Sequence, residues 1–288
     1  MTHVDSDPDV KFAENLAVVK EYLKQWKSSI DARGIYVISP SGRTFDSIAF
    51  SLLNKAYRLS VACIALLEAG YSDEAFGTAR SIIECSLSLR YMTLDRGKID
   101  SRSNDYVDFL FCEKKYFLEQ CRKYLSPGAD LDAVEAFAER EGIEDRWASI
   151  VPDRMRKKNL PFNDWKLIEN SDWNGWKIAT EPHPLDSQIN HGDWIRRQYA
   201  GDYRGGSAMV HCSIRSLDNI FADSGIAFKV GENIKTTFDH RTEPLIIIVT
   251  NLYLMVRYTF YGANVDGAEC FDKPFEDASS KLVYLRQS

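Results

Sequence analysis

Apolar residues recur at spacings of three and four along most of this chain, which is the period of one face of an α-helix. No stretch shows the sustained alternation of a half-buried strand. We therefore expect an all-α bundle of about eight to ten helices, in a single domain over residues 1–288. The pattern predicts helices over 9–33, 46–69, 73–94, 104–125, 130–141, 193–200, 206–222 and 244–261.

Two neighbouring predicted helices, 46–69 and 73–94, form the centre of the expected bundle. Gly70 suits the left-handed conformation that ends many helices, so the short link after it predicts an antiparallel helical hairpin. Each helix carries an apolar stripe: Leu53, Tyr57, Val61, Ile64 and Leu67 on the first, and Phe76, Ala79, Ile83, Leu87 and Tyr91 on the second.

The segment 244–261 is apolar on nearly all sides. It is short for a membrane span, and Asn251 and Arg257 would lie inside the bilayer at a cost of several kcal/mol. We therefore expect a central helix that its neighbours bury, and no membrane association.

A long stretch, 159–192, is interrupted by proline and glycine and contains three tryptophans. A loop of this length in a compact domain is usually functional or packed by its own aromatic side chains. His183, His191 and Asp193 lie in or beside it, but their spacing matches no familiar metal site. We expect neither a metal nor a cofactor.

Charge and cysteine content narrow the setting. The net charge is 36 − 42 = −6, whereas a protein that holds nucleic acid by bulk electrostatics is usually basic, so any RNA contact must use local patches such as 154–158 or 196–197. Charge runs of this kind are also common on solvated faces. The six cysteines form no CxxC pair, and the acidic first nine residues do not resemble a signal peptide. A reducing cytoplasm is the expected location.

The candidate chemistry lies in Tyr203-Arg-Gly-Gly-Ser-Ala-Met-Val-His211. Seven positions span about two helical turns, so Arg204 and His211 fall on one face of the predicted helix. A permanent cation beside a titratable imidazole can hold a phosphate and move a proton, which suffices to cleave RNA without a metal. The alternative is an ordinary arginine in a first helical turn and a buried histidine with its hydrogen bonds satisfied.

A second feature is Arg80-Ser-Ile-Ile-Glu84, in which the two charged residues stand four apart on one helix face. As a surface pair they would contribute only a few tenths of a kcal/mol. The alternative is that Glu84 orients Arg204 or His211 from across the bundle, which would raise the pKa of His211 and fix its tautomer.

Three separated motifs carry a family resemblance: residues 69–84, Trp173-Asn-Gly, and Tyr203-Arg-x-x-Ser207-x-x-x-His211. They resemble a widespread bacterial helical family of unknown function, with Arg-Ser-x-x-Glu and Tyr-x3-Ser-x3-His motifs, over residues 45–220. Residues 1–42 would then be an N-terminal helix and connector, and 223–288 a C-terminal helical extension.

The same motifs are similar to those of the HEPN fold, a helical bundle whose catalytic members are metal-independent ribonucleases of toxin and phage-defence systems. The resemblance implies that Arg204 and His211 are catalytic, that Arg80 and Glu84 support them, and that two copies share the site in a homodimer. Tyr203 and Ser207 would assist in binding. The six-residue spacing is at the upper limit of that motif, Gly205 replaces the polar residue that commonly follows the arginine, and the chain is longer than a minimal HEPN domain.

Three functions remain open from the sequence. The first is a HEPN-like ribonuclease that acts on RNA, with an antitoxin or defence-system protein as a further partner. The second is a non-catalytic binding or regulatory protein, in which Arg80, Glu84, Tyr203, Ser207 and His211 form a buried polar network. The third is an enzyme that uses the same residues on a small phosphorylated ligand.

Overall fold

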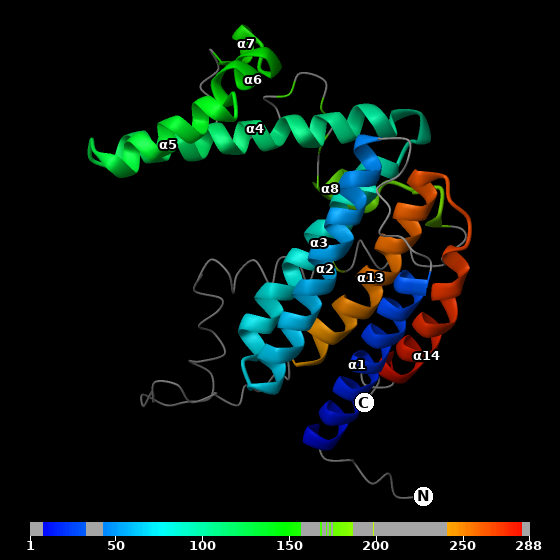
Figure 1. The fold of residues 1–288 in the computed structure, drawn as a ribbon. Coiled ribbons are helices and arrows are strands. Elements are labelled where there is room, and N and C mark those ends of the chain that lie inside the picture. The colour runs from blue at the N-terminus through cyan, green and yellow to red at the C-terminus, as the bar shows by residue number, and fades with distance from the viewer. Residues whose placement is uncertain are drawn as a thin grey trace, which may run out of the picture. The chain divides into compact units, whose positions relative to one another are not determined.

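The computed structural model describes residues 8–32, 43–156, 168, 171, 173, 175–186, 198 and 241–283. These residues form ten α-helices and no strand, so the predicted all-α fold is confirmed for the described part of the chain (Figure 1). The chain divides into two compact units, residues 1–96 with 175–288 (unit 1) and residues 97–174 (unit 2). A compact unit need not fold on its own, so the single domain expected over residues 1–288 stays a prediction.

The predicted hairpin is the centre of unit 1. Helix α2 (Thr44–Glu68) and helix α3 (Ser72–Thr93) run antiparallel, as expected (Figure 1). At the turn Gly70 has a φ of 85°, Gly70 N donates to Leu67 O at 3.1 Å, and Tyr71 N donates to Leu66 O at 2.8 Å. These two bonds are those of a Schellman motif, which satisfies the last carbonyls of α2 and turns the chain back on itself.

Helix α13 (Thr242–Ala263) packs against both α3 and α2, and nearly all of its side chains are buried. The predicted burial of 244–261 is therefore confirmed. Both α2 and α13 are long and apolar enough to cross a membrane, but the apolar window of α13 is 94% buried and that of α2 is 39% buried. Burial on nearly all sides is typical of a helix in the core of a bundle, so α13 is such a helix.

Four more elements complete the described part of unit 1. Helix α1 (Pro8–Ala32) packs chiefly on α14 (Asp272–Val283) and on α13, and it touches α2 little. The short helix η4 (Ala268–Phe271) leads into α14, and α8 (Gly175–Thr180) packs on α3.

Unit 2 follows a short helix, η1 (Arg96–Lys98), and contains four α-helices. They are α4 (Ile99–Tyr124), α5 (Ala129–Arg140), α6 (Ile143–Ile150) and α7 (Asp153–Arg156). Its described core consists of two small clusters: Phe109, Cys112, Val151 and Ile168 in one, and Leu118, Ala138 and Ile143 in the other.

One member of the predicted apolar stripes is misplaced. Val61 is 48% exposed, whereas all five stripe residues of α3 are buried. Near Val61 the buried positions of α2 are taken by small side chains, namely Ala56, Ser60 and Cys63, so the core-facing side of α2 differs here from the predicted stripe. The predicted helices at 193–200 and 206–222 lie outside the described residues, apart from position 198.

Candidate functional site

The structure places only part of the predicted site. Arg204, His211, Tyr203 and Ser207 lie outside the described residues, so their proximity to one another stays a prediction. Arg80 and Glu84, the two supporting residues, both lie on α3 of unit 1.

Arg80 and Glu84 form an ion pair along α3. Arg80 Nη2 lies 2.8 Å from a Glu84 carboxylate oxygen, with side-chain exposures of 15% and 44%. The contact predicted from their four-residue spacing is therefore confirmed. The guanidinium is the more buried partner, and the carboxylate is almost half exposed. An arginine placed N-terminal to a glutamate is the weaker order of such a pair, so its intrinsic contribution to helix stability is small.

A buried arginine network elsewhere on α3 was not predicted from the sequence. Arg90 is 1% exposed, and each of its five N–H groups has an acceptor. Nε donates to Ile178 O at 2.9 Å, and Nη2 donates to Glu181 O at 2.6 Å. Nη1 and Nη2 bind the two carboxylate oxygens of Asp186 at 3.0 and 3.1 Å, and Nη1 also donates to the Tyr258 hydroxyl at 2.9 Å. The fork thus joins α3, α13 and residues 178–186.

The Asp186 carboxylate has a further hydrogen-bond donor besides Arg90. It accepts a hydrogen bond from the backbone N–H of His183 at 2.7 Å, in addition to the two from Arg90. Burial acts to raise the pKa of Asp186, but these charge-assisted bonds outweigh it and hold the pKa below its usual value. Asp186 is therefore a fixed anion that closes the turn at 183–186.

His183 sits beside this network as a neutral side chain. Its Nδ1 accepts the backbone N–H of Leu185 at 3.0 Å, so the ring proton is on Nε2, which lies 3.1 Å from Thr93 Oγ1. The ring packs on Tyr258 at a centroid distance of 4.7 Å. Burial and then the charge of Arg90 lower the pKa of His183 to about 3. With both nitrogens engaged, His183 serves packing and is not available as a metal ligand.

The sequence did contain a signal for this network. Arg90 interrupts the otherwise apolar or small run from Leu87 to Met92, and a charge on the buried face of a helix requires a partner. Its partner Asp186 lies 96 positions away, in the stretch rich in proline and tryptophan, where no periodic pattern locates it.

The buried thiols of the described chain are not poised as nucleophiles. Burial raises the pKa of Cys63 and of Cys112 to about 12, and that of Cys85 to about 11. Cys63 Sγ also donates to Ala75 O at 3.1 Å. With exposures of 0–3%, these three cysteines act as small hydrophobic residues of the core.

A family model matches residues 46–227 with the description Family of unknown function (DUF5677). The chain belongs to this family. The matched region nearly coincides with the resemblance expected over 45–220, and it includes Arg80, Glu84 and the 203–211 motif. No curated protein and no solved structure matches the chain.

The family region includes both helices of the central hairpin and all of unit 2, but it ends before α13. Helices α1, α13 and α14 therefore add to the family region in this chain. Because α13 covers α3, the core of unit 1 is built jointly by the family region and by the C-terminal helices.

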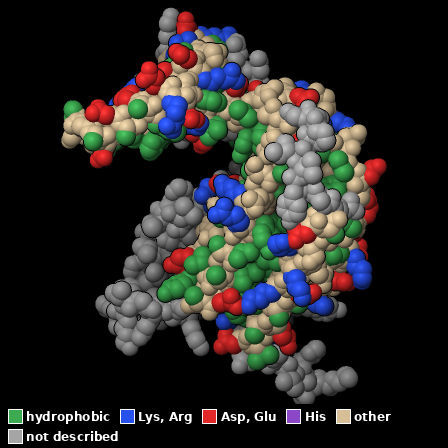
Figure 2. All heavy atoms as spheres, in the orientation of Figure 1, with side chains coloured by type: hydrophobic (Ala, Val, Ile, Leu, Met, Phe, Trp, Pro, Cys, Tyr) green, Lys and Arg blue, Asp and Glu red, His purple; other side chains and the backbone are tan. Residues whose placement is uncertain are grey.

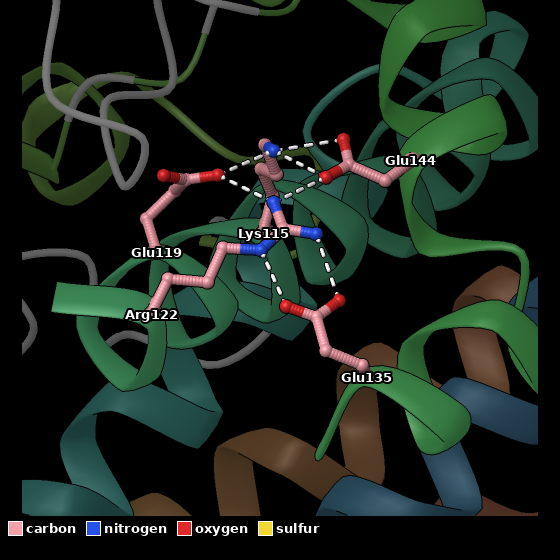
Figure 3. A network of polar contacts seen from close by, with 5 residues as sticks. All are labelled: Lys115, Glu119, Arg122, Glu135 and Glu144. Carbon is pink, nitrogen blue, oxygen red and sulfur yellow. Dashed lines mark hydrogen bonds and ion pairs between the residues drawn. The ribbon is translucent and has the colours of Figure 1, made fainter. Parts of the chain in front are cut away.

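Within the family region, unit 2 carries an ion-pair network on α4, α5 and α6 (Figure 3). Lys115 Nζ lies 2.6 Å from Glu119 and 2.7 Å from Glu144, and Arg122 contacts Glu119, Glu144 and Glu135 at 2.6–2.9 Å. Hydrogen bonds from the two cations hold the pKa of all three carboxylates below the ordinary value, although burial opposes this shift at Glu144. The network holds α5 and α6 against α4, and each of the five charged side chains is paired with at least one of opposite charge.

Proposed function

We propose that this protein is a metal-independent ribonuclease of the HEPN type, with Arg204 and His211 as its catalytic pair. The proposal rests on the spacing of these two residues in a helical chain, and metal independence comes from the resemblance. The all-α fold and the Arg80–Glu84 pair inside the family region support it. In this proposal Glu84, which is paired with Arg80 on α3, also orients a residue of the 203–211 motif.

In this mechanism His211 takes the proton from a ribose 2′-hydroxyl, and the oxygen then attacks the adjacent phosphorus. Arg204 stabilises the additional negative charge that develops on the phosphoryl oxygens. The bond to the 5′-oxygen breaks, leaving a 2′,3′-cyclic phosphate and a 5′-hydroxyl. Arg80 and Glu84 act as positioning residues, and Tyr203 and Ser207 assist in binding the RNA.

The proposal includes the setting of the activity. The two motif sets would meet in a homodimer with two-fold symmetry. Cysteines 63, 85, 112, 121 and 270 are free in the structure, which suits a reducing cytoplasm. An antitoxin or a defence-system protein would be the regulatory partner of such a nuclease.

The test is incubation of the purified protein with diverse RNAs in EDTA. We expect cleavage to products with 2′,3′-cyclic phosphate ends, and a rate that titrates near neutral pH. His211→Ala and Arg204→Ala should each lower the rate by about two orders of magnitude or more. Arg140→Ala is the matched control, because that arginine is 73% exposed on α5 and should be dispensable.

Three results would refute the nuclease: intact RNA with the wild-type protein, full activity of Arg204→Ala, or sedimentation of monomers alone at tens of micromolar. The second candidate would then be favoured, a non-catalytic binding or regulatory protein. Exposed apolar side chains on α4 and α5 of unit 2 support that candidate, and Figure 2 shows apolar side chains on the surface of this unit. Among them are Leu110, Phe117 and Phe137, with exposures of 46%, 58% and 38%. Such side chains are common at protein interfaces.

A further inference from the structure

Helix α4 of unit 2 carries a stripe of exposed apolar side chains. Leu110, Phe117 and Tyr124 are 46%, 58% and 70% exposed. They follow at intervals of seven residues, which return to nearly the same face of a helix, so they form one line about 21 Å long. This heptad spacing is typical of the seam between two packed helices.

An apolar groove of about 250 Å³ runs beside this stripe. Helix α4 lines it within 110–118, and α5 lines it at positions 134, 137 and 138. The described lining side chains are apolar except for Glu113 and Lys114. A groove between two helices receives the side chains of a further helix that packs on the pair.

The stripe points away from the ion-pair network of unit 2 (Figure 3). Phe117 follows Lys115 by two positions, which is about 200° around the helix. Lys115 and Arg122 hold α5 and α6 against the other side of α4 through Glu135 and Glu144. The helices that present the stripe are therefore already assembled, and a docking helix would not have to bring them together.

The charges beside the stripe complement those of a second, antiparallel copy of α4. Glu113 precedes Phe117 by four positions and Lys123 follows it by six, so both lie on the same side of the stripe. Lys123 Nζ lies 4.9 Å from the centroid of the Tyr124 ring, which brings the ammonium to the edge of the stripe. Across a two-fold axis at Phe117 the same sides of both copies meet. Glu113 then lies about 3 Å along the axis from Lys123 of the partner subunit.

The same pairing matches the apolar side chains. Phe117 packs on its own copy at the axis, and Leu110 packs on Tyr124 of the partner subunit. Residues 116–124 of the second copy pass along residues 110–118, the part of α4 that lines the groove. The face needs an apolar stripe with the reverse order of charges, and an antiparallel copy of α4 supplies both.

We propose that α4 is the interface of an antiparallel homodimer, in which the exposed stripes of two copies pack on each other and on the groove beside α5. The proposed function already includes a homodimer, and in that respect the inference rests on it. Catalysis is not required, since none of the residues assigned to the nuclease lies on α4 or α5.

Sedimentation velocity of the full chain at tens of micromolar tests the interface, and we expect a dimer. Phe117→Glu places two like charges at the axis and should raise the dissociation constant at least about tenfold. Val61→Glu is the matched control, because it adds the same charge at a 48% exposed valine of α2, and it should sediment as the wild type does.

Exchange of the two charges tests the pairing without touching the apolar stripe. Glu113→Lys and Lys123→Glu should each weaken the dimer roughly threefold or more, because like charges then face each other. The double variant should regain the wild-type affinity, since each new lysine again faces a glutamate of the partner subunit.

Cysteine cross-linking with a short bismaleimide tests the direction of the helices, in a background without Cys121, Cys212 and Cys270. Phe117→Cys should cross-link to its own copy. Tyr124→Cys should not, because its two copies lie about 21 Å apart along an antiparallel pair. Cross-linking at both positions would show a parallel pair and overturn the proposal.

Two further outcomes would overturn it. Wild-type monomers alone would assign the stripe to a different protein, and a dimer that Phe117→Glu leaves intact would form through another surface. The RNA assay separates these results from the nuclease. Cleavage by a dimer that Phe117→Glu leaves intact would keep the nuclease, whereas intact RNA with a dimer that Phe117→Glu dissociates would keep the interface alone.

Discussion

Arg90 and Arg80 lie on the same helix and have different surroundings. All five donors of Arg90 are satisfied at 1% exposure, so its geometry is fixed and it has no N–H left for a substrate. Removing one partner of such a buried pair lowers the free energy of unfolding by more than the intact pair contributes to it, because the remaining charge stays desolvated. Arg90 therefore holds residues 178–186 against α3, whereas the Arg80–Glu84 pair lies nearer the surface, with side-chain exposures of 15% and 44%.

His183 makes the stability of the fold depend on pH. The pKa of His183 falls from an ordinary 6.5 to about 3 on folding. Between these two pH values the imidazole is protonated in the unfolded chain and neutral in the folded chain, so acidification favours unfolding. This contribution is complete above pH 6.5 and is lost as the pH falls toward 3. We expect His183 to cost about 2 kcal/mol of unfolding free energy between pH 6.5 and pH 5, at about 1.4 kcal/mol per pH unit.

Urea denaturation of the wild type and of His183→Gln over pH 5–7.5 measures this cost. The variant should lose less stability on acidification than the wild type does. The pH range stops at 5 because the carboxylates with lowered pKa, such as Asp186, lose their contribution only below their unfolded pKa of about 4. Parallel pH profiles for the two proteins would show that His183 accepts a proton inside the fold.

At single residues, the sequence predicts local partners better than distant ones. The Arg80–Glu84 contact follows from the helical period alone, because four positions make one turn. Arg90 and Asp186 meet only because the chain returns to α3 after 96 positions. Helical periodicity does not predict contacts between residues so far apart in the sequence. The same limit applies to the predicted meeting of Glu84 with the 203–211 motif.

Among the helices, α13 and α2 make an unusually close approach at Gly262. A Cβ atom on Gly262 would lie 2.2 Å from Phe45 Cζ and 2.9 Å from Thr93 Cγ2. Phe45 is fully buried, so its ring has little room to move. Gly262→Ala gains about 1 kcal/mol of helix propensity but overpacks the core, and we expect a net loss of about 1–2 kcal/mol.

Chemical denaturation followed by circular dichroism measures this loss. The double variant Gly262→Ala/Phe45→Leu provides the check, because a shorter side chain at position 45 makes space for the new methyl group. It should be more stable than the sum of the two single changes predicts. Strict additivity, or stabilisation by Gly262→Ala alone, would show that the two helices separate without cost.

The helices themselves were largely predictable. The ranges 46–69 and 73–94 agree with α2 and α3 to within two residues, and the burial of 244–261 agrees with α13. The failure at Val61 has a physical cause. An apolar stripe gives the direction of the core only when large residues mark it, and near Val61 the buried positions of α2 hold the small residues Ala56, Ser60 and Cys63.

On the scale of the whole chain, the two units have different kinds of core. In unit 1, α3 and α13 are buried on almost every side, whereas in unit 2 helix α5 has one buried residue, Ala138. Backbone amides in helices with few buried apolar contacts exchange through local opening. We expect amide hydrogens of α5 to exchange at least tenfold faster than those of α13.

Hydrogen–deuterium exchange of the full chain, read by mass spectrometry, tests this difference. Peptides from α3 serve as the internal reference, since they should remain among the slowest with those of α13. Equal protection of α5 and α13 would mean that unit 2 opens only when the whole chain unfolds.

The order of the helices along the chain has a consequence for synthesis. Helices α2 and α3 leave the ribosome together, but α13, which covers them, begins about 150 residues after α3 ends. At roughly 5–20 residues per second this interval is about 7–30 s. During that time the nascent hairpin exposes apolar surface that is buried in the complete fold, and on α3 this surface includes Ile82, Ile83 and Leu89. We therefore expect chaperones to bind the growing chain, and we expect a ribosome stalled before residue 242 to release a product with an incomplete core.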